Sequence, residues 1–164
     1  GPDQGHTQWI GTVDEAEPAY ADFRKLLANP GPVVIGAVQF ASCFGPAYEY
    51  AAILDTALRR HRVRDRVPIT FVTSEPYLGH LGIAGVGDSK GMMEHEFRNR
   101  HVKWIANARV TKIEPGKLFA EELDAKGQLA QQHEIAFAHA MMVPAFKGVA
   151  AVAAVEGLVI RADW

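Results

Sequence analysis

The chain has a single cysteine, Cys43, among its 164 residues, which excludes an internal disulfide. Its net charge is only -2 at pH 7, so composition gives no electrostatic argument for nucleic acid, and no basic tract points to an anionic membrane. The most apolar stretch, 135–160, is interrupted by Pro144, Lys147 and Glu156, so it lacks the roughly 20 continuous apolar residues of a membrane span. The histidines show no metal-ligand spacing, and no metal site is predicted.

What is present has the size and composition of one soluble globular domain, with 48% hydrophobic and 22% charged residues. The polar start carries no secretion signal, and the chain stops abruptly on "LVIRADW". We therefore expect a fragment of a longer protein.

The apolar patterning predicts an α/β domain. A continuous apolar run at 33–37 is typical of a buried parallel strand, a helix follows from Pro46, and 69–73 is the next strand. Turn signals between later segments indicate an antiparallel meander, and "AMMV" is a further buried strand. The later strand pieces are expected at 102–106, 109–113, 117–122 and 132–137. The predicted fold class is Rossmann-like (FAD/NAD(P)-binding type), a parallel sheet with helices and an inserted antiparallel β-meander.

The loop after the first strand carries an incomplete dinucleotide fingerprint. Aligned from Gly36, the second glycine is replaced by Val38, whose branched side chain would obstruct a phosphate, and the third by the tolerated Ala41. Glu75 ends the second strand where a ribose-binding acid would lie, although farther along than the usual roughly 20 residues. The fold is predicted to be of the nucleotide-binding type, with a disabled loop.

Cys43 lies just before Gly45 and Pro46, at the expected N-terminus of a helix. Unpaired N–H groups and the positive end of the helix dipole stabilise a thiolate at such a place, and the thiolate is the nucleophilic form. A lone cysteine can equally be an inert, buried small residue. Position alone leaves the two interpretations open.

Three blocks, "GAVQFASCFGPAYEYA", "FVTSEPYLGHLGIAGVGDSKG" and "MMVPAFKGV", resemble the central part of sulfide:quinone oxidoreductases, FAD-dependent relatives of the flavoprotein disulfide reductases. The resemblance covers nearly the whole chain. It implies a second Rossmann-like domain that does not use NAD, with the FAD domain and a membrane-anchoring C-terminal region outside the chain. The expected parts are a flanking segment and helix leading in from the FAD domain (1–30), the second Rossmann-like domain (31–150) and a segment returning toward the FAD domain (151–164).

The resemblance also implies residue roles. Cys43 matches one of two cysteines that form the family's redox disulfide or sulfur bridge beside the flavin, and its partner is expected beyond this chain. His80, in "LGHLG", matches a histidine proposed to assist proton movement there. Gly11 stands where many relatives carry a third cysteine, sometimes attached to FAD, so covalent attachment is left open. Glu15 replaces a histidine of those relatives, and Phe40 stands where a glycine is usual.

The implied activity of the full-length protein is FAD-dependent oxidation of sulfide through a cysteine–flavin relay, with reduction of a quinone. The alternatives are the flavoprotein subunit of a cytochrome-linked sulfide dehydrogenase, a non-catalytic NAD(H)-binding module, and an enzymatically silent scaffold. The resemblance implies a peripheral protein of a bacterial cytoplasmic membrane, attached through the region beyond this chain. The fragment itself is expected to be soluble and inactive, to bind no FAD, and to self-associate through the surface that would face the FAD domain.

Overall fold

A parallel sheet forms the centre of the protein in a computed structural model that describes residues 5–146, 151 and 155. Its strands lie in the order β3-β2-β1-β7. They are β1 (Val33–Ala37), β2 (Ile69–Thr73), β3 (Val102–Ile105) and β7 (His139–Val143). Three helices pack on one face, namely α1 (Val13–Ala28), α2 (Gly45–Arg60) and α3 (Ser89–Asn99), with a short 3-10 turn η2 (Arg64–Arg66) after α2.

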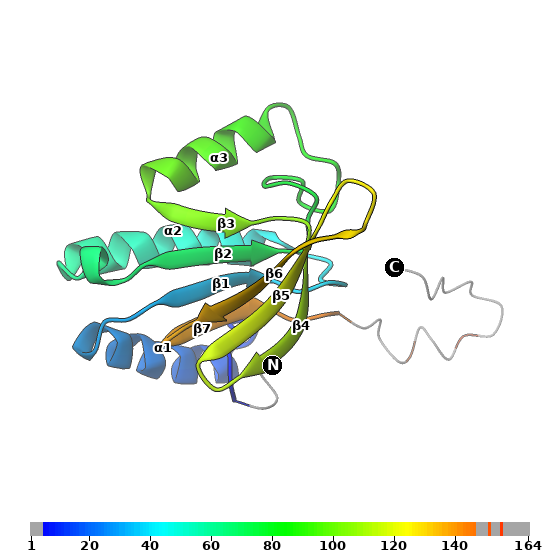
Figure 1. Cartoon of the computed structure of the whole chain (residues 1–164). Helices are drawn as coiled ribbons and strands as arrows, with labels where there is room; N and C mark the ends of the chain where they lie inside the picture. Colours follow the sequence, from blue (N-terminus) through cyan, green and yellow to red (C-terminus); the bar gives the residue numbers. More distant parts are fainter. Residues whose placement is uncertain (1–4, 147–150, 152–154, 156–164) are drawn as a thin grey trace.

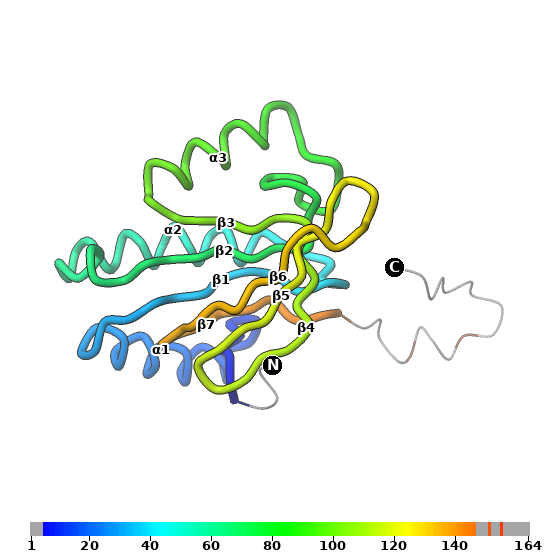
Figure 2. Tube along the Cα trace, viewed as in Figure 1, coloured from blue at the N-terminus to red at the C-terminus, as the bar shows by residue number. Residues whose placement is uncertain are grey.

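An antiparallel sheet covers the opposite face (Figure 1). It consists of β4 (Ala108–Glu114), β5 (Lys117–Leu123) and β6 (Leu129–Ala136). The trace in Figure 2 shows that these strands lie across the parallel sheet and do not extend it. The predicted fold class, a Rossmann-like α/β domain with an inserted meander, is confirmed.

Strand β1 lies inside the sheet, between β2 and β7, and both of its faces are buried. Val33 and Ile35 belong to the core under the helices, whereas Val34 belongs to the core under the meander. Gly36 is required by backbone packing, since a Cβ there would lie 1.8 Å from the carbonyl oxygen of Val72 in the neighbouring strand. A continuous apolar run with one glycine is therefore what this position in the sheet needs.

The helices begin where the residues supply start signals. Thr12 caps α1: its hydroxyl oxygen accepts from Glu15 N and donates to the Glu15 carboxylate. Pro46 occupies the first turn of α2, and Arg59 and Arg60 lie in its last turn. Because α1 also packs against β7, the residues expected to lead in from another domain form part of this core.

The carboxyl ends of the parallel strands all meet at one end of the protein, on the right in Figure 1. The loops after β1 and β2 leave from this carboxyl edge, and the chain beyond β7 starts there too. The expected return segment, 151–164, lies outside the described residues apart from positions 151 and 155. None of the helices in the described part of the chain has the length and hydropathy of a membrane span.

Candidate active site at the carboxyl edge of the parallel sheet

Cys43 is exposed, in the loop between β1 and α2. Two backbone hydrogen bonds close this loop, from Val38 N to Val143 O at 3.1 Å and from Ala41 N to Val38 O at 3.2 Å. The buried side chains of Ala41 and Phe44 anchor it on either side of Cys43. The interpretation of Cys43 as a buried small residue is therefore wrong, because its neighbours fill the core and the thiol faces solvent.

The thiol immediately precedes a helix terminus. Phe44 is the N-cap residue of α2, and no side chain accepts a hydrogen bond there from the first turn. The first-turn N–H groups therefore keep their partial positive charge, which favours a negative group nearby. This geometry suits a cysteine that reacts as a thiolate.

His80 lies in the loop between β2 and α3, on the same edge of the sheet. This loop requires glycine, because left-handed backbone recurs along it. The left-handed residues are Gly79, Leu81, Gly82, Ala84, Gly85 and Gly87. The Nδ1 atom of His80 accepts a hydrogen bond from Gly82 N at 3.2 Å. In the neutral ring the proton is therefore on Nε2, which is left to act on a partner.

A direct contact joins the two loops. Gly82, two residues after His80, packs against the ring of Phe44, the residue after Cys43. A Cβ built on Gly82 would lie 3.4 Å from Cε2 of Phe44. The structure therefore brings both predicted site residues to one edge of the sheet, through neighbours that touch.

The carboxylate of Glu75 points inward and organises the loop after β2. Only 2% of Glu75 is exposed. Its Oε2 accepts hydrogen bonds from the hydroxyls of Tyr48 and Thr73, both at 2.7 Å, and its Oε1 accepts one from Leu81 N at 2.6 Å. The Tyr48 oxygen in turn accepts a hydrogen bond from Gly79 N at 2.9 Å. We call this arrangement the Tyr48–Glu75 clamp.

The clamp engages the acid that holds the ribose-binding position of the fingerprint. Glu75, which holds the sequence position of a ribose-binding acid, is buried with its oxygens occupied. The Val38 N–H donates to Val143 O in β7, and the Val38 carbonyl accepts from the Ser74 hydroxyl, so the start of the loop is held against its neighbours. The Val38 N–H, at the position of the second fingerprint glycine, therefore already has a partner.

Sequence reasoning did not find the clamp. Tyr48 was not singled out, because its bond to Glu75 crosses 27 residues and no local pattern indicates it. Burial is the main cause that raises the pKa of Tyr48 well above its usual range, and the charge of Glu75 adds to it. The one sequence signal was Glu75 itself, an acid directly after an apolar strand.

Position 11 is crowded by an aromatic ring. A Cβ on Gly11 would lie 2.2 Å from Nε1 of Trp9, so a cysteine there requires the indole to move. The Trp9 ring also makes an edge contact with Phe146, with 6.2 Å between ring centroids. Glu15, which replaces a histidine of the relatives, is engaged in capping α1 with Thr12.

Phe40 has a left-handed backbone, with φ of 66°, and its side chain is 64% exposed. This conformation favours glycine, which accounts for the glycine that is usual at this place in the resembling sequences. Further exposed apolar side chains follow from the same edge of the sheet. They are Ile83, Val86 and Phe146. Within the described residues, no group of three His, Cys, Asp or Glu side chains is placed to hold a metal ion.

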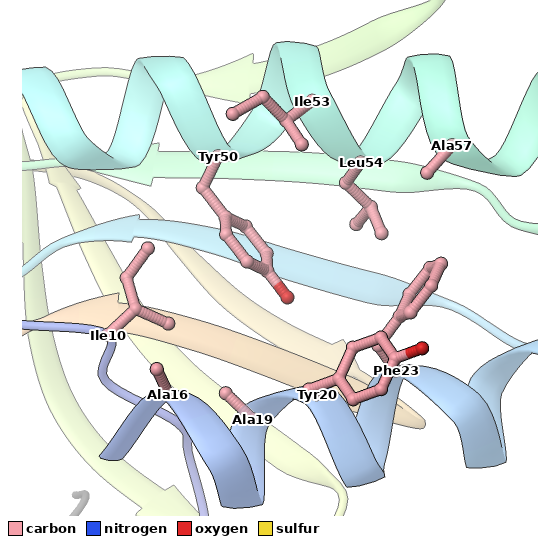
Figure 3. Close-up of a pocket in the computed structure, with 9 residues that line it drawn as sticks. All are labelled: Ile10, Ala16, Ala19, Tyr20, Phe23, Tyr50, Ile53, Leu54 and Ala57. Atoms are coloured by element: carbon pink, nitrogen blue, oxygen red, sulfur yellow. The ribbon is translucent and has the colours of Figure 1, made fainter. Parts of the chain in front are cut away.

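An apolar groove lies between α1 and α2, away from Cys43 (Figure 3). Its volume is about 270 Å³, and Tyr50 forms one wall with its hydroxyl 2.8 Å from Nε2 of His139. The lining residues are Ile10, Ala16, Ala19, Tyr20, Phe23, Tyr50, Ile53, Leu54 and Ala57. None of them carries a charge, so the groove suits an apolar occupant.

Comparison with known proteins gives a strong match on both sequence and structure. The chain is 45% identical over 139 residues to a sulfide-quinone reductase of Aquifex aeolicus, and the match covers 85% of this chain and 31% of that protein. The crystal structure of the sulfide:quinone oxidoreductase of Aquifex aeolicus superposes with a TM-score of 0.84 and 44% identity, covering 92% of this chain and 34% of the other. The chain thus spans about a third of the length of these relatives. No protein-family profile matches it.

More distant structures share the fold. NDH2 of Plasmodium falciparum, solved in complex with NADH, superposes with a TM-score of 0.65 at 9% identity, over 85% of this chain and 30% of that one. A ferredoxin reductase of Rhodopseudomonas palustris gives 0.54 at 12% identity, over 82% and 28%. At these identities the likeness concerns the backbone alone.

Proposed function

We propose, on the premise that this chain is a relative of the sulfide:quinone oxidoreductases along about a third of their length, that it supplies the redox cysteine of such an enzyme. The observation that carries the proposal is the exposed thiol of Cys43 at the carboxyl edge of the sheet, within a sequence 45% identical to a sulfide-quinone reductase. The carboxyl edge of an open α/β sheet is where such folds place their chemistry.

The proposed chemistry begins with a disulfide between Cys43 and a second cysteine outside this chain. Sulfide attacks one sulfur, the old sulfur–sulfur bond breaks, a persulfide bond forms, and the other cysteine leaves as a thiolate. The helix terminus behind Cys43 stabilises negative charge on its sulfur during this exchange. FAD, when bound by the longer protein, supplies the two-electron acceptor, and a quinone receives the electrons.

His80 is proposed to move the proton of this exchange. Gly82 N fixes Nδ1, so the ring presents Nε2 and cannot turn without losing that bond. The contact between Gly82 and Phe44 ties the histidine loop to the cysteine loop. The loop that carries His80 therefore packs against the loop that carries Cys43.

FAD is proposed to be held outside this chain; the occupied carboxylate of Glu75 and the Val38 N–H already bonded to Val143 O support this. The proposal therefore assigns the flavin to the part of a longer protein beyond this sequence. Phe40, Ile83 and Phe146 are the exposed apolar surface that such a part would cover. Because the proposed electron acceptor is a membrane quinone, the proposal also places the whole enzyme peripherally at the cytoplasmic membrane of a bacterium.

The test uses the full-length protein with Cys43→Ser. We expect sulfide-dependent quinone reduction to fall by at least a factor of about 1,000, because no bond to sulfur can form, while flavin absorbance near 450 nm stays unchanged. The matched control is Ser42→Ala, the exposed neighbour, which should keep its activity within about twofold. Full activity in Cys43→Ser would contradict the proposal. Transfer of electrons to a cytochrome but not to a quinone would instead identify the cytochrome-linked dehydrogenase.

A further inference from the structure

The end of the protein opposite Cys43 is strongly basic, although the net charge of the chain is -2. We call it the basic end, at the left of Figure 1, where α2 and α3 finish and β3 begins. It collects eight of the 17 lysines and arginines from two separate stretches, 59–66 and 98–103. They are Arg59, Arg60, Arg62, Arg64, Arg66, Arg98, Arg100 and Lys103.

Arg64 joins the two stretches into one surface. Its guanidinium donates to Asp55 Oδ1 and to the carbonyl oxygens of Val67 and Arg100, each at 2.6 Å, and to His101 O at 3.2 Å. The buried Asp55 carboxylate also binds Arg59 at 2.9 Å and Arg100 at 3.2 Å. The Asp55 carboxylate thus holds three arginines together. The same end also carries Asp65, Glu94 and Glu96, of which Glu94 pairs with Arg98 and Glu96 with Arg100, so eight cations against four carboxylates leave a net charge of +4.

Part of this charge has no internal partner. Arg60, Arg62 and Arg66 are exposed, and none of them makes an ion pair with any residue that the structure describes. The 16 residues of α2 separate this end from the carboxyl edge by about 24 Å. That distance exceeds the Debye length of about 8 Å at physiological salt, so the acidic residues elsewhere do not cancel the field here.

A hollow at the basic end combines positive charge with an apolar floor. Its volume is about 470 Å³, and Arg60, His61 and Arg100 surround it. Its floor includes Ile53 and Ala57, and these two residues also line the apolar groove between α1 and α2. Ile53 and Ala57, on α2, therefore connect the basic hollow with the groove of Figure 3.

We propose that this surface binds an anionic phospholipid of a bilayer, with the headgroup phosphate between Arg60, His61 and Arg100 and an acyl chain along Ile53 and Ala57. Arginine suits phosphate because its planar fork donates two parallel hydrogen bonds. An uncharged groove of small, aliphatic and aromatic residues suits a hydrocarbon chain. This surface is distinct from the Cys43 edge, and the inference does not depend on the proposed sulfide chemistry.

The charge and the apolar surface together favour a lipid over other anions. A nucleic acid would use the arginines but gains nothing from an adjoining apolar groove with no charged lining. Free phosphate would likewise engage only the hollow. The stretch 59–66 alone carries five arginines, and the fold, through Arg64, joins it to the second stretch at 98–103.

The test is co-sedimentation of the full chain with phosphatidylcholine vesicles, with and without about 30% phosphatidylglycerol. We expect binding only to the anionic vesicles and release at about 0.5 M salt. The triple variant Arg60→Gln, Arg62→Gln, Arg66→Gln should bind about a hundredfold more weakly, at about fivefold per charge. The matched triple Lys90→Gln, Lys112→Gln, Lys126→Gln removes the same charge elsewhere and should bind like the wild type.

A second pair of variants tests the groove. Ile53→Glu places a charge where the acyl chain would lie and should weaken binding at least about tenfold. Val13→Glu adds the same charge on α1 at a residue that is 87% exposed and outside the groove, and should have little effect. Absence of binding to anionic vesicles, equal binding to neutral ones, equal loss in both lysine and arginine triples, or full binding by Ile53→Glu would overturn the proposal. Complete displacement by about 10 mM inorganic phosphate would overturn it in favour of a free anion.

Discussion

The Tyr48 hydroxyl lies 2.7 Å from Oε2 of Glu75, so helix α2 and the loop after β2 share one buried hydrogen bond. The same tyrosine oxygen accepts from Gly79 N, and the same carboxylate accepts from Leu81 N. His80 lies between these two amides. The position of His80 relative to the Cys43 loop is therefore fixed by the buried side chains of Tyr48 and Glu75.

Removal of the clamp hydroxyl should loosen this loop. Tyr48→Phe leaves Gly79 N without an acceptor and Glu75 with one donor fewer, and should lower the free energy of unfolding by about 1–3 kcal/mol. Urea unfolding measures the loss, and limited proteolysis within 79–88 should become faster. The control Tyr20→Phe, on a side chain that is 63% exposed, should change stability by less than about 0.5 kcal/mol. Equal effects of the two changes would contradict the clamp.

Replacing Phe40 with glycine should stabilise the folded protein. Its φ of 66° costs a residue with a Cβ about 1 kcal/mol, and its exposed ring gains little from burial. We expect Phe40→Gly to raise the free energy of unfolding by about 0.5–1 kcal/mol. Phe40→Ala removes the same ring but keeps the strained conformation, so it should be less stable than the glycine variant. Chemical unfolding of the three proteins decides the order, and a glycine variant below the alanine variant would refute the argument.

His139 should make stability depend on pH. Burial lowers its pKa below the ordinary value of about 6.5, and Asp22 opposes this only in part. The unfolded chain then binds a proton that the folded chain does not. The contribution of His139 is therefore complete above about pH 6.5 and declines as the pH falls through the folded pKa, by at most about 1.4 kcal/mol per pH unit.

The check is the difference in unfolding free energy between wild type and His139→Gln, measured from pH 7.5 to 5. The difference should shrink as the pH falls, since glutamine does not titrate. A difference in unfolding free energy that grows as the pH falls would contradict this prediction.

Cys43 should react while the protein is folded. The thiol is exposed and precedes the uncapped terminus of α2, so we expect an alkylating reagent to modify the folded chain at pH 7.5 at least as fast as the chain in urea. Mass spectrometry after short exposures measures both rates. A folded rate more than about tenfold below the unfolded one would show that the loop shields the sulfur.

NADH should bind weakly or not at all. The acid that would hold a ribose is occupied inside the clamp, and Val38, at the phosphate-approach position, carries a branched side chain and has its N–H bonded to Val143 O. Calorimetry at up to about 1 mM NADH should give no saturable heat, corresponding to a Kd weaker than about 1 mM. Micromolar affinity would restore the NAD(H)-binding module as the better account of this fold.

The sequence predicted the structure best where a residue pattern is compatible with only one kind of element. The apolar runs at 33–37 and 69–73 became β1 and β2 with the same limits, because strands buried on both faces need unbroken hydrophobicity. Strand β6 begins at Leu129 instead of 132, since the residues before Gln132 are exposed and show no alternation of buried and exposed positions, and only pairing with β5 makes them a strand. Exposure of Cys43 could not be predicted either, because it depends on Ala41 and Phe44 occupying the core.

The site and the basic end differ in what sequence can show. His80 and Cys43 were predicted from motifs, but the contact between Gly82 and Phe44 that joins their loops has no local signal. Arg64 looked like one cation among many, and only folding makes it the link to Arg100. Interactions between residues far apart in the chain are what the one-dimensional pattern leaves undetermined.

The strand order also has a consequence during synthesis. Strand β1 pairs on one side with β2, which follows soon after, and on the other with β7, the last strand among the described residues. A nascent chain therefore displays the apolar β1 as an open sheet edge until β7 has left the ribosome, and such edges recruit other chains. Truncations that end before His139 should accumulate as aggregates, whereas those that end after Val143 can close the sheet.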